Sequence, residues 1–307
     1  MTTDPLTVAQ EVLGDRARTM VPIGPFTTYK VGGPAALFVE VTDDDVLAAV
    51  GTAVRASQVP VLVVGNGSNL LVADAGFPGI AVRLGDAYAS VEVDGTEVRA
   101  GGAALLPVVA RQTVKAGLTG FEWAVGVPGS VGGAVRMNAG GHGSDMAASL
   151  LGVRVFDCRT GEDAAVPASA LDLGYRRSAI TADQVVLRAT LGLAVDESGQ
   201  GADTLSEIVR WRRANQPGGQ NAGSVFTNPE GDSAGRLIDA AGCKGLRRGT
   251  AEVSPKHANF IQADPGGRAD DVLAVMVAVR DAVEDHSGVR LHPETRLVGF
   301  DQAEVSW

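Results

Sequence analysis

Apolar residues recur along this chain at the spacing of an α-helix in several segments. Helices are expected where that spacing is sustained, at 43–57, 104–116, 204–215 and 270–285. We expect Thr42 to begin the first helix, with Asp45 three positions on. Thr204 and Glu207 match a capping box at the start of the third. The last helix carries a broad apolar stripe, which is more typical of a core helix than of a cofactor contact.

Shorter apolar runs between these helices predict β-strands. The runs fall at 36–41, 60–64, 80–84, 152–158 and 185–193, with a hairpin over 89–100. The hairpin is expected to turn at Asp94-Gly95. The first strand, the first helix and the second strand form a β-α-β unit, and strands dominate after it. The composition changes at 194–201, which we interpret as a linker before the last third of the chain.

Composition and charge narrow the function classes. With 307 residues, of which 45% are hydrophobic, the chain is long enough for two or three compact units. A formal net charge of −10 argues against nucleic acid as a partner. Two cysteines and four histidines show no disulfide framework and no metal-ligand spacing, so no metal is expected. We find no signal-peptide pattern and no long apolar run, and expect a soluble, cytoplasmic protein.

Glycine is concentrated in the segment 121–141, with the sequence FEWAVGVPGSVGGAVRMNAGG. Without a Cβ, glycine lets backbone N–H groups approach a ligand closely, and successive N–H groups form concavities suited to a diphosphate. A mobile surface loop is the alternative interpretation. Val127, Val131, Val135 and Met137 are apolar anchors that a flexible linker would lack. The segment therefore favours an ordered cofactor-binding role.

A second glycine-containing turn, GNGSN at 65–69, follows a predicted strand. The dinucleotide fingerprint would need a third glycine where Leu70 stands, and the residues after it make a poor helix. A Rossmann site is therefore disfavoured. The turn still offers N–H donors and polar side chains to a diphosphate. No Walker lysine is present, so an ATP-hydrolysing loop is not supported.

Other polar segments are open to two interpretations. Ser224 lies in a turn without a histidine or lysine near it in sequence, which fits a proton donor better than a nucleophile, or simply a turn former. Asn228 precedes a proline and fits a turn equally well. Arg176 and its neighbour Arg177 would suit a carboxylate or phosphate, or a solvated strand end. Composition alone gives no reason to select Glu294 among 36 acidic residues.

Together, eight motifs in this order resemble one enzyme family. They are TYKVGGPA (28–35), GNGSNLL (65–71), GVPGSVGGAV (126–135), MNAG (137–140), GYR (174–176), AGSVFTNP (222–229), KHANFI (256–261) and PETR (293–296). The series is similar to the UDP-N-acetylenolpyruvoylglucosamine reductases, flavoenzymes of peptidoglycan precursor synthesis. It covers nearly the whole chain.

The resemblance implies an α+β fold with an FAD-binding unit of the vanillyl-alcohol-oxidase-like kind and a C-terminal substrate domain. We expect FAD-binding subdomains at 1–86 and 87–195 and the substrate domain at 196–307. The implied reaction is reduction of an enolpyruvyl UDP-sugar with NADPH, through non-covalently bound FAD, by a monomer. The rivals are another FAD-dependent oxidase or dehydrogenase of the same fold, and a sugar-nucleotide-binding module without turnover.

The resemblance also assigns roles to individual residues. Arg176 would be the catalytic arginine, Ser224 the proton donor and Glu294 the catalytic glutamate. The substrate would contact Tyr175, Asn228 and His257. The residues expected to bind FAD are Tyr29, Gly65, Asn66, Gly67, Ser68, Asn69, Leu70, Gly126, Pro128, Gly129, Ser130, Gly132, Gly133, Ala134, Asn138, Ala139 and Gly140. One branch of the family has a long loop with a tyrosine over the substrate. Here that interval is short, so the chain resembles the branch without the loop.

Overall fold

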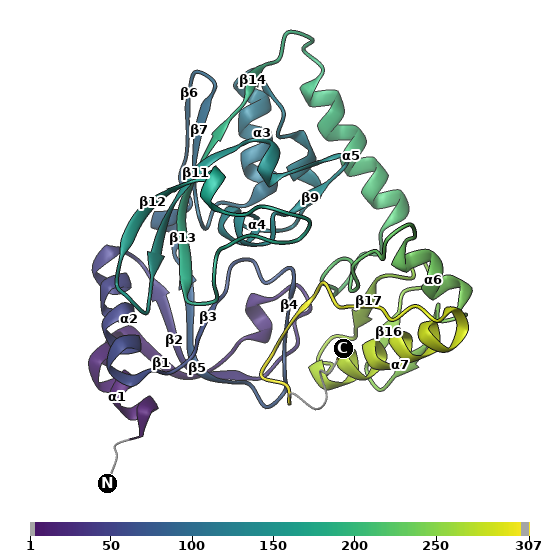
Figure 1. The fold of residues 1–307 in the computed structure, drawn as a ribbon, viewed down its shortest axis with the longest axis horizontal. Coiled ribbons are helices and arrows are strands. Elements are labelled where there is room, and N and C mark those ends of the chain that lie inside the picture. Colours follow the sequence, from purple (N-terminus) through teal and green to yellow (C-terminus); the bar gives the residue numbers. More distant parts are fainter. Residues whose placement is uncertain (1–3, 302–306) are drawn as a thin grey trace. The chain divides into compact units, whose positions relative to one another are not determined.

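The computed structural model describes residues 4–301 and 307 of the chain (Figure 1). Its α-helices are α1 (Pro5–Leu13), α2 (Asp44–Ser57), α3 (Leu106–Lys115), α4 (Val131–Met137), α5 (Gly201–Asn215), α6 (Ala234–Ala240) and α7 (Ala269–Ser287). None of the helices in these residues is both long and apolar enough to cross a membrane.

The chain folds into two compact units that are not continuous in sequence. The first comprises the described residues up to Thr19, Ala36–Asn66 and Gly79–Arg212. The second comprises Met20–Ala35, Gly67–Pro78 and the described residues from Arg213. The GNGSN turn therefore crosses from the first unit to the second after Asn66. The division into three domains at 86 and 195 stays a prediction.

The first unit contains an antiparallel five-stranded sheet. Its strands, in order across the sheet, are β12 (Asp163–Pro167), β11 (Leu150–Asp157), β13 (Gln184–Gly192), β7 (Glu97–Gly101) and β6 (Val91–Asp94). Two short ribbons pair β9 (Gly140–Gly141) with β10 (Ser144–Asp145) and β8 (Leu118–Thr119) with β14 (Ala194–Val195). A buried apolar cluster joins the sheet to α3 and α4.

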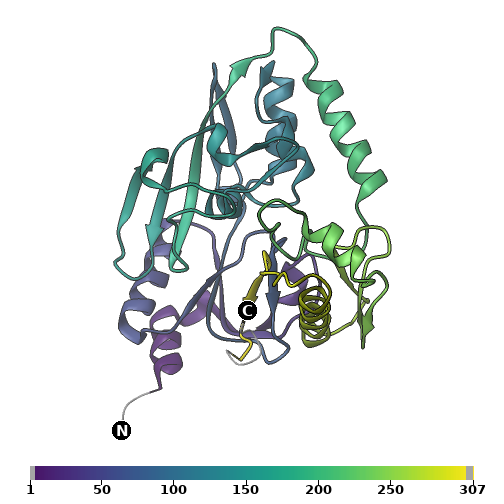
Figure 2. The same ribbon diagram turned by 45° about the vertical axis from the view of Figure 1, so that its right-hand side comes forward.

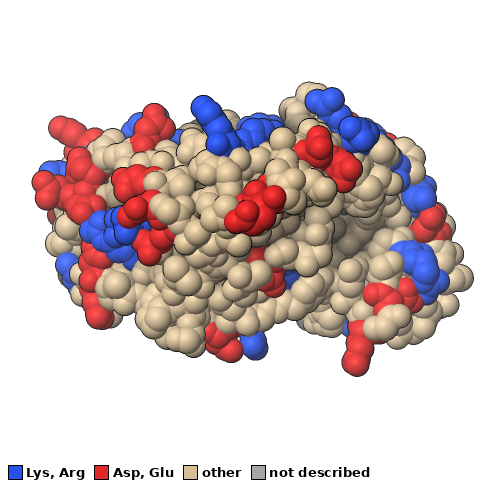
Figure 3. All heavy atoms as spheres, turned by 90° about the horizontal axis from the view of Figure 1, so that it is seen from above, with Lys and Arg blue, Asp and Glu red and all other residues tan. Residues whose placement is uncertain are grey.

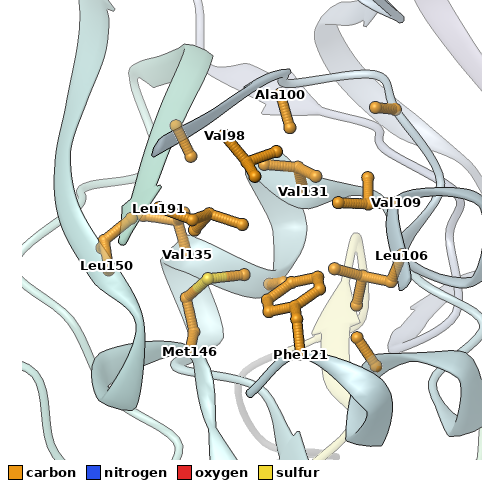
Figure 4. Packing of buried hydrophobic residues seen from close by; sticks show 14 of the residues in the cluster. Val98, Ala100, Leu106, Val109, Phe121, Val131, Val135, Met146, Leu150 and Leu191 are labelled. Atoms are coloured by element: carbon orange, nitrogen blue, oxygen red, sulfur yellow. The ribbon is translucent and has the colours of Figure 1, made fainter. Parts of the chain in front are cut away.

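Figure 4 shows part of this cluster, in which Val131 and Val135 of α4 pack with Phe121 and Met146. All four side chains are fully buried. Two of the predicted apolar anchors of the 121–141 segment are thus confirmed as core residues. They fix α4 to the sheet, so the glycines between them are held in place.

A four-stranded sheet has the order β1 (Ala17–Pro22), β2 (Pro34–Val41), β5 (Phe77–Leu84) and β3 (Val61–Val63). Its strand β3 runs parallel to β5, with Val61 opposite Ile80. The apolar face of α2, including Leu47, Val50 and Val54, packs in one buried cluster with residues of β2 and β5. The predicted β-α-β unit is present, with β5 lying between its two strands.

The second unit is smaller and contains a three-stranded antiparallel sheet. The strands are β15 (Arg247–Arg248), β16 (Ala251–Val253) and β17 (Ile261–Ala263). This sheet packs against α7, and α7 contacts α6 (Figures 1 and 2). Elsewhere in this unit, β18 (Arg296–Val298) runs parallel to β4 (Leu70–Val72). The apolar stripe of α7 is buried, as predicted for a core helix.

Two predicted helix starts are wrong. The first helix begins after Asp43, not Thr42, because the Asp43 carboxylate accepts the N–H of Val46 at 2.9 Å. The third helix, α5, begins at Gly201. Thr204 consequently lies inside it and donates its N–H to the carbonyl of Gln200 at 3.0 Å, so no capping box forms there.

The early start of α5 has a local cause in the segment interpreted as a linker. The carboxylate of Asp196 accepts the N–H groups of Ser198, Gly199 and Gly201 at 3.1, 3.0 and 3.0 Å. The bond to Gly201 satisfies an N–H group at the start of the helix that has no partner within it, and the other two order the turn before it. The segment is therefore an ordered turn leading into a helix.

Acidic and basic side chains are interspersed on the face seen in Figure 3. Among the described residues, several ion pairs join different elements. The guanidinium of Arg154, for example, contacts the carboxylates of Asp44 at 2.8 Å and Asp163 at 2.5 Å. These pairs hold β11 to β12 and to the start of α2.

Candidate functional site

The first unit contains a pocket with about 660 Å³ of space free of protein atoms, part of it open to solvent. Residues from five segments line it: 63–66, 83–84, 102–105, 130–136 at the start of and within α4, and 180–186. Both glycine-containing segments singled out in the sequence contribute to its wall.

The structure brings these two segments into direct contact within the first unit. The amide of Asn66 donates to the carbonyl of Pro128. A Cβ at Gly65 would lie only 2.5 Å from Ser130 Oγ, so the close approach requires glycine there. Predicted FAD-binding residues from positions about 65 apart in the sequence thus form one wall.

The start of α4 is fixed by backbone hydrogen bonds. Val131 N donates to Ala104 O at 2.8 Å, and Gly132 N donates to Gly102 O at 2.9 Å. Ser130 Oγ accepts the N–H of Gly133 at 3.4 Å as the helix cap. The pocket wall is consequently preformed by the protein's own hydrogen bonds.

Gly133 has free space beside it on the pocket wall. A Cβ there would meet only Ser130 Oγ, at 3.5 Å, and would otherwise face open space in the pocket. Its neighbour Gly132 differs, because a Cβ there would lie 3.2 Å from the carbonyl oxygens of both Gly102 and Val186. The exposed backbone at Gly133 and the polar groups of Asn66 and Ser130 are features that suit a cofactor with a diphosphate.

Other glycines of the predicted cofactor set are required by contacts within the protein. A Cβ at Gly140 would lie 2.6 Å from Asp145 Cβ, and one at Gly126 would lie 3.0 Å from the ring of His142. In the second unit, a Cβ at Gly67 would lie 2.4 Å from the carbonyl oxygen of Phe26. Chain packing accounts for these three glycines, and their FAD contacts stay a prediction.

Arg176 lies in a loop between β12 and β13, in the left-handed region with φ 55°. Gly174 and Arg177 exchange two backbone hydrogen bonds, at 3.0 and 3.1 Å, across this loop. The Arg176 guanidinium donates to Gly140 O at 3.4 Å and lies 5.3 Å from the centre of the Tyr175 ring. Tyr175 itself is 64% exposed. The loop thus presents an arginine beside the MNAG segment.

In the second unit the structure brings Ser224 and Glu294 onto neighbouring strands of backbone. Glu294 N donates to the carbonyl of Val225 at 2.7 Å, and Phe226 forms an antiparallel bridge with Pro293. The amide of Asn69 donates to Glu294 O at 3.0 Å. A hydroxyl and a carboxyl group 70 positions apart in sequence therefore share one small framework.

Asn259 completes that framework, and sequence reasoning missed it. Its side chain accepts the N–H of Phe226 at 3.0 Å and donates to Phe226 O at 2.9 Å. The backbone carbonyl of Asn259 accepts the N–H of Val225 at 3.0 Å. Only a carboxamide supplies both a donor and an acceptor in this way. Asn259 belongs to the KHANFI motif, but from that motif the sequence prediction selected only His257.

The remaining predicted residues have identifiable surroundings. Asn228 Oδ1 accepts the N–H of Ala234 at 3.0 Å, and His257 Nδ1 accepts the N–H of Asn259 at 3.3 Å. Burial lowers the pKa of His257, which favours the neutral ring. Tyr29 is fully buried, which raises the pKa of its hydroxyl, and this hydroxyl has no partner among the described residues.

Comparisons with known proteins decide the family. Residues 34–163 match the model of the FAD binding domain, and residues 215–298 match that of the UDP-N-acetylenolpyruvoylglucosamine reductase C-terminal domain. The reductase of Paramagnetospirillum magneticum is 42% identical over 281 residues, covering 91% of each chain. The chain belongs to the UDP-N-acetylenolpyruvoylglucosamine reductase family. The predicted family, its α+β fold and its FAD cofactor are thereby confirmed.

A further relative and a solved structure support the same family assignment. The reductase of Synechococcus sp. is 42% identical over 289 residues, covering 92% of this chain and 94% of the relative. The crystal structure of UDP-N-acetylenolpyruvylglucosamine reductase from Thermus caldophilus superposes with a TM-score of 0.81. It is 36% identical and the match covers 92% of this chain and 99% of that one.

The candidate residues are distributed between the two matched ranges. Ser224, Asn228, His257 and Glu294 lie in the range of the C-terminal domain, and the glycine-containing wall of the pocket lies in the FAD range. Arg176 lies between the two ranges. Its role consequently depends on the GYR motif and on the loop described above.

The pocket predicts a specific effect of a larger side chain at Gly133. We expect Gly133→Val to purify without FAD, because the side chain would fill the pocket without meeting close protein atoms. The flavin-to-protein absorbance ratio after purification measures this. Gly133→Ala is the matched control, since its Cβ stands 3.5 Å from Ser130 Oγ. A folded Gly133→Val variant with a full complement of FAD would show that the cofactor binds elsewhere.

Proposed function

We propose that this chain catalyses the NADPH-dependent, FAD-mediated reduction of UDP-N-acetyl-3-O-(1-carboxyvinyl)glucosamine to UDP-N-acetylmuramate. The observation that carries the proposal is the match to named reductases over 91% of both chains. The pocket in the first unit, lined by both glycine-containing segments, supports the cofactor assignment. When bound, FAD supplies the hydride carrier that couples oxidation of NADPH to reduction of the enol ether.

The protein's part in binding FAD is preorganisation. Gly133 leaves room for close approach of a ligand, and Gly65 lets Ser130 pack against the 65–66 turn. Asn66 and Ser130 offer polar groups at the same wall. The hydrogen bonds of α4 to the 102–104 segment keep this wall in place before any ligand arrives. Less conformational freedom is then lost on binding.

Arg176 binds the carboxylate of the enolpyruvyl group and stabilises the negative charge that develops on it. A guanidinium stays charged at all relevant pH values and offers two parallel N–H donors to a carboxylate. The motif match and the partly buried position of the side chain beside Gly140 support this assignment. Preorganised donors of this kind supply much of the rate enhancement in many enzymes.

Ser224 supplies the proton that C2 of the enolpyruvyl group takes up after hydride reaches C3. Glu294 stabilises the same intermediate. Val225, the residue after Ser224, accepts the N–H of Glu294 through its carbonyl, and this bond holds the two backbones together. It supports the paired roles of Ser224 and Glu294. Hydride and proton together account for the two hydrogen atoms that the product gains.

Tyr175, Asn228 and His257 are assigned to the substrate on the same motif match. The exposed ring of Tyr175 beside Arg176 supports its assignment. We further infer that the enzyme acts as a monomer, because one chain carries every residue given a role. NADPH and UDP-sugars are cytoplasmic metabolites, and we place the reaction in the cytoplasm.

The experiment that tests this function follows substrate and product together. The purified protein is incubated with NADPH and the enolpyruvyl sugar nucleotide, and products are analysed by mass spectrometry. We expect NADPH oxidation that depends on the sugar nucleotide, and a product heavier than the substrate by two hydrogen atoms. Oxidation of NADPH by oxygen with unchanged sugar nucleotide would instead identify a flavin oxidase.

A further inference from the structure

The side chain of Asn138 is buried and makes three hydrogen bonds within the first unit. It is 3% exposed and occupies the left-handed position that ends α4, with φ 38°. Its Nδ2 donates to Gly174 O at 3.0 Å and to Asp145 Oδ2 at 3.1 Å. Its Oδ1 accepts the N–H of Ala147 at 2.9 Å. Both amide hydrogens are thus used by the protein, which leaves no donor for a ligand.

One of these partners is the carbonyl of the loop that carries Arg176. Gly174 O also accepts the N–H of Arg177 at 3.1 Å, which is one of the two backbone hydrogen bonds that close the loop. Arg176 and Asp172 both have positive φ, at 55° and 42°. Non-glycine residues keep this conformation only where surrounding contacts enforce it.

The segment 136–140 holds this loop at three points. Ser178 Oγ donates to Arg136 O at 2.7 Å, and the Arg176 guanidinium donates to Gly140 O at 3.4 Å. The Asn138–Gly174 bond lies between them and is the only one of the three made by a side chain of this segment. The same segment leads directly out of α4, whose residues line the cofactor pocket.

We propose that Asn138 is a positioning residue for Arg176. Its amide fixes Gly174, and through Gly174 it keeps Arg176 in the left-handed conformation that directs the guanidinium. The wall of the cofactor pocket and the arginine are then held in a fixed relation by one side chain. This role rests on the function proposed for Arg176 and replaces, for Asn138, the direct FAD contact that its motif implies.

An exchange of two side chains isolates the bond to Gly174. Asn138→Asp alone would place two carboxylates together, because Asp145 lies 3.1 Å away. Combining it with Asp145→Asn restores that contact with the donor reversed and leaves the net charge unchanged. The acceptors for Ala147 and Ala148 are also kept. Only Gly174 O loses a donor: it keeps the N–H of Arg177 but faces a carboxylate where the Asn138 amide stood. Asp145→Asn alone is the control for the second position: its single amide oxygen cannot serve both Asn138 Nδ2 and the N–H of Ala148, but the Asn138 donor to Gly174 O is kept.

Limited trypsin digestion reads the loop without using activity. We expect the exchanged variant to be cleaved after Arg176 or Arg177 roughly tenfold faster than wild type, with the sites identified by mass spectrometry. We also expect it to retain FAD and to be reduced by NADPH at close to the wild-type rate. Its reoxidation by the sugar nucleotide should be roughly ten- to a hundredfold slower, the scale expected for a misplaced catalytic group.

The contrary outcomes are distinct. Wild-type cleavage together with wild-type reoxidation would overturn the proposal. Loss of FAD with an unchanged cleavage rate would overturn it in favour of a cofactor contact. In an Arg176→Lys background the exchange should slow reoxidation no further, and a full additional loss would show that Asn138 does not act through Arg176. If Arg176→Lys alone turns over normally, the role given to Arg176 fails, while faster cleavage would still establish the hold of Asn138 on the loop.

Discussion

Replacing Ser224 with alanine is expected to slow the reaction with the enolpyruvyl sugar nucleotide by roughly a hundredfold, the usual scale for losing a positioned acid. FAD binding and reduction by NADPH should stay close to wild type, because the proton donated by Ser224 belongs only to the second half of the reaction. A group that acts in the transition state also predicts a fall in kcat with little change in substrate binding.

Stopped-flow absorbance, run separately for the two half-reactions, measures this effect. Thr227→Val is a suitable control, because it removes a hydroxyl three residues away whose bond to His292 O is exposed. If flavin reduction slows as much as reoxidation, Ser224 shapes the site instead of donating a proton. If neither half-reaction slows, Ser224 is only a turn former.

Arg176→Lys is expected to reduce turnover by a factor on the order of ten to a thousand. Lysine keeps the positive charge but cannot offer two parallel donors to a carboxylate, so the change is not conservative at such a site. Steady-state turnover with saturating NADPH measures the loss.

Arg177→Lys provides the matched control. The Arg177 side chain is 65% exposed and pairs with Asp172, which is 73% exposed. Exposed ion pairs contribute little to stability, and we expect this variant to turn over normally. Normal turnover of both lysine variants would show that Arg176 is a solvated residue at a strand end.

Elements with a long, regular apolar pattern were predictable from the sequence. The apolar stripe of α7 and the alternation of apolar and polar residues in the β6–β7 hairpin depend on local spacing, which can be read from the sequence. The starts of α2 and α5 could not be predicted from the sequence. The carboxylates that accept the first N–H groups are those of Asp43 and Asp196, and neighbouring residues such as Thr42 and Thr204 were equally plausible caps. Local signals of similar strength are decided by small energetic differences.

The candidate site was predictable only in part, for a different reason. The motif order located the glycine-containing wall and the positions of Ser224 and Glu294. Asn138 and Asn259 gave no sign of their partners, because those partners lie 36 and 33 positions away in the chain. Glycine density also had two causes that the sequence does not separate: Gly133 opens toward the pocket, whereas Gly140 avoids a clash with Asp145.

The most direct test of the central claim is an anaerobic spectrum of the purified protein. We expect a yellow protein whose flavin absorbance is bleached by NADPH and returns when the enolpyruvyl sugar nucleotide is added without oxygen. A colourless protein would contradict the assignment of FAD. A reduced protein that regains its colour only when oxygen is admitted would contradict the assignment of the substrate.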